Sequence, residues 1–205
     1  MSRARARGTR ERHNLPLHRT RLIGRERDVA AVRQAVLERE GHLVTLTGAG
    51  GCGKTRLALQ AGRDLVETFE DGVWLVELAP LVDPLLVPQA VARALEVTEQ
   101  PGRPILETLL AKLQSRQLLL VLDNCEHLVD ACAQLADRLL TACPRLRLLA
   151  TSREPLRISG EIAWPVAPLA VPDPRQLPVG IAEAVTFRPC SCSWSGPKPR
   201  SLTSR

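Results

Sequence analysis

Residues Leu43–Thr55 read LVTLTGAGGCGKT, and this stretch decides the fold. It begins with apolar and β-branched residues, which favour a short buried strand. From Gly48 onward it fits the pattern G-x-x-x-x-G-K-[ST]. Glycines let a backbone wrap around a phosphate with its N–H groups pointing inward, and the start of a helix adds partial positive charge. The stretch therefore predicts a strand, a phosphate-binding loop and a helix, in that order.

The loop predicts a site for ATP or ADP with Mg²⁺. Lys54 would supply a full positive charge to the β- and γ-phosphates, and Thr55 would offer its hydroxyl to Mg²⁺. The alternative is a glycine-rich turn that happens to precede Lys-Thr. Cys52 is either a loop residue that only fills space or a redox-active group. The loop residues predicted to bind the nucleotide are Gly48, Ala49, Gly50, Gly51, Cys52, Gly53, Lys54, Thr55 and Arg56.

Strands and helices alternate on both sides of this loop. The apolar run at 118–122 is continuous, which is typical of a strand buried on both faces of a parallel sheet. The order predicts an α/β fold: a doubly wound, mostly parallel sheet of about five strands with helices on both faces, as in a P-loop NTPase core. The expected strands are 43–47, 73–78, 118–122, 146–150 and 162–166. The expected helices are one ending before Gly41, then 54–69, 84–95, 104–116 and one from Leu128 to before Pro144.

Asp123 follows the continuous apolar run directly. Ligands of open α/β sheets bind at the carboxyl ends of the strands, so an acid there lies beside the phosphate loop. Asp123 is therefore predicted to hold Mg²⁺ through water, together with Thr55. The alternative is an aspartate that caps a helix or stabilises a turn.

The residues after Asp123 bear on hydrolysis. Many rapid P-loop ATPases carry a glutamate directly after this aspartate, whereas this chain has Asn124, whose amide cannot accept a proton as a base. Glu126 is the nearest spare carboxylate, and it is either a catalytic group or a charge favoured at a helix N-terminus. His127 is interpreted as a structural neighbour. The pattern indicates slow ATP hydrolysis at most.

Thr151-Ser152-Arg153 follows another expected strand, so it also faces the phosphates. An arginine there can detect the γ-phosphate through a charge-assisted contact. Lys54, Asp123, Glu126 and Arg153 are thus the candidate catalytic residues. The alternative for Arg153 is a surface side chain paired with Glu154.

Charge divides the 205 residues into three parts. The net charge of +6 comes from the ends, because 22–185 holds more acidic than basic residues. We expect an Arg-rich disordered arm over 1–21, a P-loop domain over 22–172 and an irregular tail over 173–205. An acidic body argues against a DNA-binding surface on the domain itself. Aromatic residues make up only 2%, which disfavours stacking on single-stranded nucleic acid.

The sequence also bears on the cellular compartment. No apolar run approaches the ~20 residues that span a bilayer, and the basic start of the chain lacks the apolar core of a secretory signal. The six cysteines show no paired metal-binding spacing except Cys190-Ser-Cys192, which lacks partners. These features predict a cytoplasmic protein without a membrane partner.

Four motifs, in order and spacing, resemble the signal-transduction (STAND, NB-ARC-like) P-loop ATPases. They are Ile23-Gly24-Arg25-Glu26, the phosphate loop, LVLDNCEH at 120–127 and LATSRE at 149–154. The sequence is most similar to the ATPase module of bacterial LuxR-type and SARP-type transcriptional regulators, over residues 14–173. Asn14-Leu-Pro16 looks like the usual start of that module.

This resemblance implies more than spacing can show. Ile23, Gly24 and Arg25 would lie by the adenine and ribose, and Arg153 would detect the γ-phosphate. Bound ADP would hold a closed state, and exchange for ATP would open it toward self-association. DNA would be contacted only through domains that this chain lacks.

The sequence departs from this family after the ATPase core. The helical and winged-helix subdomains, with their Gly-x-Pro motif and histidine, are not found. Residues after about 185 do not resemble the family, and our hypothesis is that they are out-of-frame translation of a truncated regulator. Three alternative functions stay open: a small-molecule or nucleotide kinase, a nucleic-acid-binding protein that uses the basic arm, and a non-functional fragment.

Overall fold

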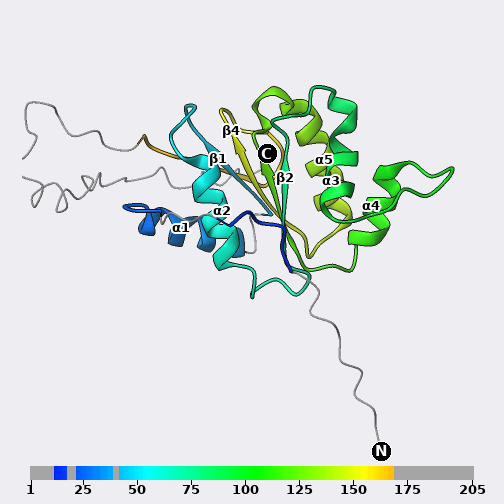
Figure 1. Ribbon diagram of the computed structural model, residues 1–205, viewed down its shortest axis with the longest axis horizontal. Helices are drawn as coiled ribbons and strands as arrows, with labels where there is room; N and C mark the ends of the chain where they lie inside the picture. The colour runs from blue at the N-terminus through cyan, green and yellow to red at the C-terminus, as the bar shows by residue number, and fades with distance from the viewer. Residues whose placement is uncertain (1–11, 18–21, 39–41, 169–205) are drawn as a thin grey trace, which may run out of the picture. The chain divides into compact units, whose positions relative to one another are not determined.

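Five parallel strands form one sheet in the computed structural model, which describes residues 12–17, 22–38 and 42–168 (Figure 1). The strand order is β2-β3-β4-β1-β5, and every neighbouring pair is parallel. This arrangement confirms the predicted fold class. The strands are β1 (Leu43–Thr47), β2 (Val73–Glu77), β3 (Leu119–Asp123), β4 (Arg147–Ser152) and β5 (Glu161–Pro165).

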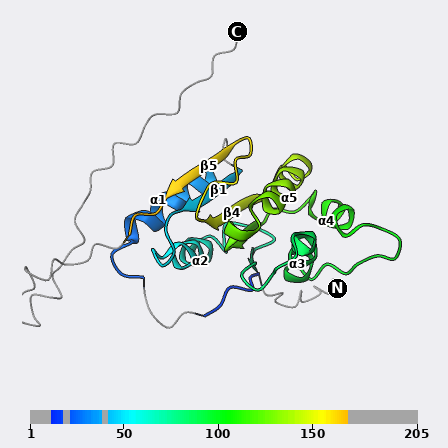
Figure 2. The ribbon, with the colours of Figure 1, turned by 90° about the horizontal axis from the view of Figure 1, so that it is seen from above.

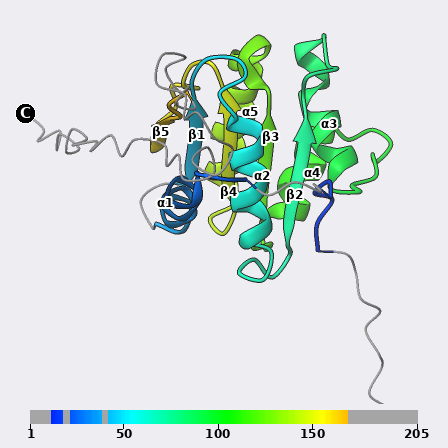
Figure 3. The same cartoon turned by 60° about the vertical axis from the view of Figure 1, so that its left-hand side comes forward.

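Helices cover both faces of this sheet, as Figures 2 and 3 show. One face packs against α1 and α2, and the other against α3, α4 and α5. Two short 3₁₀ helices, η1 and η2, precede α3 and α5. The bounds are α1 (Glu26–Leu37), α2 (Lys54–Asp64), η1 (Pro84–Leu86), α3 (Val87–Ala94), α4 (Ile105–Leu113), η2 (Cys125–His127) and α5 (Val129–Ala142).

The β3 strand shows why its sequence is apolar without interruption. Side chains alternate between the faces of a sheet, and here both faces are covered. Leu119 and Val121 pack into the core beneath α1 and α2. Leu120 and Leu122 pack into the core beneath α3, α4 and α5. All four side chains are fully buried, so β3 contributes to the core on both faces of the sheet.

The helix after the loop is shorter than predicted. The expected span was 54–69, but α2 ends at Asp64. Beyond it the backbone tightens into turns, in which Leu65 N–H donates to Gly62 O and Thr68 N–H to Leu65 O. Leu65 and Phe69 are still buried, so their apolar spacing reflects core packing rather than continued helix.

The other predicted elements differ at their ends. The predicted helix over 84–95 is divided into η1 and α3, with Asp83 capping η1 through Leu85 N–H. The strands predicted over 118–122 and 146–150 both start and end later in the sequence than predicted. As a result Asp123 is the last residue of β3 and Ser152 the last residue of β4.

Residues 12–17 correct part of the predicted disordered arm. They lie along the outer edge of β2, where His13 forms a parallel bridge with Val73. The Asn14 side chain then takes the place of a strand backbone: its Nδ2 donates to Leu75 O at 2.8 Å, and its Oδ1 accepts from Leu75 N at 2.6 Å. Order here follows from the unpaired edge of β2, which needs partners for its N–H and C=O groups.

Several predictions fall outside the described residues. The remainder of the arm, at 1–11 and 18–21, lies there, as does the tail over 173–205 with its proposed change of frame. Among the described residues, no helix is long and apolar enough to cross a membrane.

Replacing Asn14 with alanine tests the edge contact. Asn14→Ala removes two hydrogen bonds to Leu75 and should lower the free energy of unfolding by about 1–3 kcal/mol. Leu17→Ala, at a highly exposed side chain of the same segment, is the matched control and should change it by less than about 0.5 kcal/mol. Urea denaturation measures both, and equal unfolding midpoints for the two variants would contradict this account.

Candidate nucleotide-binding site

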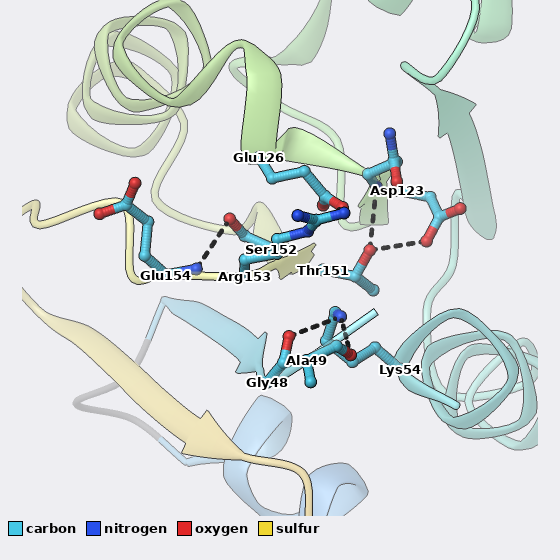
Figure 4. Close-up of polar contacts among 10 residues, drawn as sticks. Gly48, Ala49, Lys54, Asp123, Glu126, Thr151, Ser152, Arg153 and Glu154 are labelled. Atoms are coloured by element: carbon cyan, nitrogen blue, oxygen red, sulfur yellow. Dashed lines mark hydrogen bonds and ion pairs between the residues drawn. The ribbon is translucent and has the colours of Figure 1, made fainter. Parts of the chain in front are cut away.

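The candidate site lies where β1, β3 and β4 end. These three strands are neighbours in the sheet and run parallel, so their carboxyl ends meet at one edge. The loops that follow them carry the three motifs that the sequence nominates. Figure 4 shows residues of these loops facing one another across the edge of the sheet.

The glycines of the phosphate loop are needed at specific points. Gly48, Gly51 and Gly53 have φ angles of 146°, 79° and 94°, which side-chain-bearing residues rarely adopt. A Cβ on Gly48 would also lie 2.9 Å from Val166 O. Cys52 is buried within the loop, where its Sγ packs near Gly48, a position that fits the filler interpretation.

Lys54 is the first residue of α2, so its side chain starts at the helix N-terminus that faces the loop. It is only 8% exposed. Its Nζ donates to Gly48 O at 2.8 Å and to Ala49 O at 3.0 Å (Figure 4). The ammonium group is therefore held inside the curve of the loop by neutral carbonyls.

Asp123, at the end of β3, connects the start of α2 to the end of β4. Its Oδ1 accepts a hydrogen bond from Thr55 Oγ1 at 2.7 Å and another from Thr151 Oγ1 at 2.6 Å. Thr151 Oγ1 in turn accepts from Asn124 N–H at 2.9 Å. The sequence assigned no role to Thr151, because the contact depends on β4 lying beside β3 in the sheet.

Residues 124–127 fold into a tight turn and then η2. Asn124 adopts a left-handed conformation with φ of 68°. His127 Nε2 contacts Leu81 O at 2.8 Å, which agrees with its interpretation as a structural neighbour. Cys125 is fully buried, and its hydrogen bond with Cys132, together with burial, raises the pKa of its thiol well above the usual range.

Arg153 forms an ion pair with Glu126, and not with Glu154 as the alternative drawn from the sequence had it. Its Nε lies 3.4 Å from Glu126 Oε1, whereas Glu154 pairs with Arg157 at 2.7 Å. The Arg153 guanidinium also reaches the phosphate loop, because a Cβ on Gly50 would lie 3.7 Å from its Nη2. The structure thus brings Arg153 and Glu126 together over the loop.

The motif around Arg25 lies on the other side of the loop. Ile23 is 82% exposed, and Gly24 N–H donates to Glu26 Oε1. Arg25 is buried: Nη2 donates to Cys52 O at 3.3 Å and Ala167 O at 2.5 Å, and Nη1 pairs with Asp28 at 2.8 Å. The protein itself therefore satisfies the Arg25 guanidinium.

The groups present fit a nucleotide with Mg²⁺. Lys54 provides a cation inside the loop, and among the described residues no atom beyond the adjacent residues of the chain lies within 4 Å of the Cβ positions of Gly51 and Gly53. Thr55 and Asp123 provide a hydroxyl and a carboxylate, which are the oxygen donors that Mg²⁺ prefers. Within the described ranges, no cluster of three or more His, Cys, Asp or Glu offers an all-protein metal site.

Comparisons with known proteins place this site in a family. Residues 37–158 match the family described as AAA domain. The chain is 42% identical over 159 residues to the uncharacterized protein Rv0894 of Mycobacterium tuberculosis, a match that covers 78% of the chain and 40% of that protein. It is 47% identical over 134 residues to the "Putative HTH-type transcriptional regulator Rv0890c" of the same organism, covering 65% of the chain and 15% of that protein.

Solved structures agree on the fold. ORC2 of Aeropyrum pernix, solved as ADPNP–ADP complexes, has a TM-score of 0.51 and 16% identity, over 70% of this chain and 48% of that chain. A STAND protein with a tetratricopeptide repeat sensor from Pyrococcus horikoshii has a TM-score of 0.51 and 15% identity, over 73% of this chain and 24% of that chain. At such identities the likeness concerns the fold alone.

The fold and the phosphate loop define a P-loop NTPase. More narrowly, the chain belongs to the AAA domain family, because the match covers more than half of its residues. The predicted P-loop ATPase class is thereby confirmed. The narrower resemblance to NB-ARC-like modules of LuxR-type and SARP-type regulators stays a prediction, and the chain spans less than half the length of either mycobacterial relative.

Two glycine substitutions test the geometry of the loop. Gly48→Ala places a Cβ against Val166 O at a strained φ and should cost about 2–4 kcal/mol of unfolding free energy. Gly50→Ala is the matched control, since its Cβ would meet only Arg153 at an ordinary distance, and it should change that free energy by less than about 0.5 kcal/mol. Chemical denaturation compares them; similar losses in both variants would contradict this loop geometry.

Proposed function

We propose that this domain binds ATP and ADP with Mg²⁺ and works as a slow nucleotide-dependent switch in a bacterial transcriptional regulator. One observation carries the proposal: Lys54 inside the loop and the Thr55–Asp123 contact lie side by side at the same sheet edge. A phosphate chain and its Mg²⁺ need a cation and oxygen donors in this relation.

The present partners of Lys54 support phosphate binding. Its Nζ donates to two neutral loop carbonyls, and an anionic phosphate oxygen is a stronger acceptor than either. The N-terminus of α2 points at the same place and favours negative charge. A nucleotide would therefore find the ammonium group already positioned.

Mg²⁺ would be held through Thr55 and Asp123. Asp123 Oδ1 already accepts a hydrogen bond from the Thr55 hydroxyl, so both oxygens converge on one point. Bound with ATP, Mg²⁺ neutralises charge on the β- and γ-phosphates. Thr151, through its own hydrogen bond to Oδ1, would keep the carboxylate oriented.

Slow hydrolysis is supported by the state of the nearby acids. Asn124 occupies the position after Asp123 and cannot act as a base. Asp123 Oδ1 already accepts two hydrogen bonds, and Glu126 Oε1 is paired with Arg153. The unpaired Oε2 of Glu126 is buried away from water, and Asp123 would face Mg²⁺, so neither carboxylate is well placed to take a proton from water.

The position of Arg153 supports the proposed switch, and the comparisons support its place in a transcriptional regulator. The Arg153 guanidinium is 69% exposed and lies over the loop, within reach of a γ-phosphate. One mycobacterial relative carries the name of an HTH-type transcriptional regulator, and one structural neighbour is a STAND protein with a repeat sensor. In a regulator of that kind, this domain would act in the cytoplasm, self-associate in the ATP state and leave DNA contact to other domains.

Lys54→Ala tests nucleotide binding. Mg·ATP that binds the native state at about 100 times its Kd stabilises it by about 2.7 kcal/mol, and loss of the ammonium group should remove that stabilisation. Thermal unfolding with and without Mg·ATP measures it. Lys112→Ala, at an exposed lysine on α4, is the matched control and should keep the shift. An undiminished shift in Lys54→Ala would overturn the site.

Thr55→Val tests the Mg²⁺ contact, because it keeps the side-chain shape and removes the hydroxyl that faces Asp123. We expect the enhancement of ATP affinity by Mg²⁺ to fall about tenfold, or about 1.4 kcal/mol, because the ion loses one of the two oxygen donors that the chain would offer. Titration with ATP in Mg²⁺ and in EDTA measures the enhancement, and in EDTA the variant should bind like the natural chain. A full Mg²⁺ enhancement in the variant would place the ion elsewhere.

A further inference from the structure

The ion pair between Arg153 and Glu126 is unevenly buried. The Glu126 side chain is 19% exposed and that of Arg153 69%, with Arg153 Nε 3.4 Å from Glu126 Oε1. The second carboxylate oxygen, Oε2, is buried and makes no hydrogen bond. The guanidinium is thus the main partner of a largely desolvated carboxylate.

Glu126 is the fixed member of this pair. It lies in the middle of η2, between two anchored neighbours. Cys125 Sγ donates to Leu122 O at 3.5 Å, and His127 Nε2 contacts Leu81 O at 2.8 Å. Arg153 follows the end of β4 and is mostly exposed, so its long side chain is the part that can move.

The same guanidinium also reaches the phosphate loop. Its Nη2 lies 3.7 Å from the Cβ position of Gly50, in the loop that would wrap the phosphates. Figure 4 shows Arg153 between Glu126 and the loop, with Lys54 on the far side. An anion bound in the loop would therefore compete with Glu126 for one cation.

We propose that Glu126 determines how strongly the site prefers ATP over ADP, by holding Arg153 away from the position of the terminal phosphate. This inference rests on the proposed function of the loop as a site for both nucleotides. ADP has no γ-phosphate to attract Arg153, so its binding leaves the ion pair intact. ATP must break the pair to gain the Arg153 contact, so the pair lowers the affinity for ATP alone.

Glu154 provides the matched control. It is adjacent to Arg153 in sequence, but its carboxylate pairs with Arg157 at 2.7 Å. Glu154→Gln removes the same charge from the same neighbourhood without touching the Arg153–Glu126 pair. It should leave the ATP-to-ADP affinity ratio unchanged.

The test compares affinities of the full chain for ADP and for the β,γ-imido analogue of ATP, each with Mg²⁺, by displacement of a fluorescent nucleotide. Glu126→Gln should raise the ratio of ATP-analogue to ADP affinity about two- to fivefold, the range expected for a partly exposed ion pair. Glu126→Asp keeps the charge but shortens the side chain, and it should raise the ratio in the same direction.

Arg153→Ala separates the ion pair from general electrostatics. Removing a negative charge near the phosphates favours the more highly charged nucleotide whether or not Arg153 is present. In the Arg153→Ala background only this general effect remains, so the proposal predicts that Glu126→Gln raises the ratio clearly less than it does when Arg153 is present. Such a double-mutant cycle isolates the pairwise interaction.

The affinity measurements have three possible outcomes. A raised ratio in both Glu126 variants, clearly smaller in the Arg153→Ala background and absent in Glu154→Gln, supports the proposal. An unchanged ratio in Glu126→Gln and Glu126→Asp, or a rise of the same size with and without Arg153, overturns it while leaving nucleotide binding in place. If the natural chain binds neither nucleotide, the proposed function itself fails and this inference fails with it.

Discussion

One carboxylate oxygen holds the site together. Oδ1 of Asp123 accepts hydrogen bonds from Thr55, at the start of α2, and from Thr151, at the end of β4. Hydrogen bonds to a charged acceptor are stronger than neutral ones, so this oxygen joins the ends of β3 and β4 to the phosphate loop. The left-handed turn at Asn124 belongs to the same arrangement, since it directs a backbone N–H to the Thr151 hydroxyl.

The two edges of the sheet limit pairing with other chains in different ways. Residues 12–14 pair with β2 through backbone and Asn14 side-chain groups. At the opposite edge, β5 ends in Pro165, which has no N–H to leave unpaired. Val166 N–H then donates to Thr47 O, so the chain stays bound to β1 up to the start of the loop. The segment on β2 and the proline at the end of β5 both reduce the number of free donors at the sheet edges, which disfavours pairing with other chains.

Sequence reasoning could predict the fold and the phosphate loop because both depend on local patterns. The run at 118–122 is apolar throughout, and only a strand covered on two faces needs that composition. Partners of charged side chains were less predictable. Arg153 pairs with Glu126, which follows a different strand, and not with the adjacent Glu154. Such pairs depend on the order of strands in the sheet, which spacing along the chain does not contain. The same reason explains why Thr151 had no predicted role.

Arg25 illustrates how a buried charge can define geometry. A guanidinium carries five N–H donors and stays charged, so its burial is tolerated only where acceptors surround it. Here the acceptors come from three separate places: Asp28 in α1, Cys52 O in the phosphate loop and Ala167 O after β5. If the loop moved alone at Cys52, a buried donor would lose its partner. The phosphate loop, the start of α1 and the segment after β5 are therefore held as one unit, whereas the pair that Arg153 forms with Glu126 is more exposed.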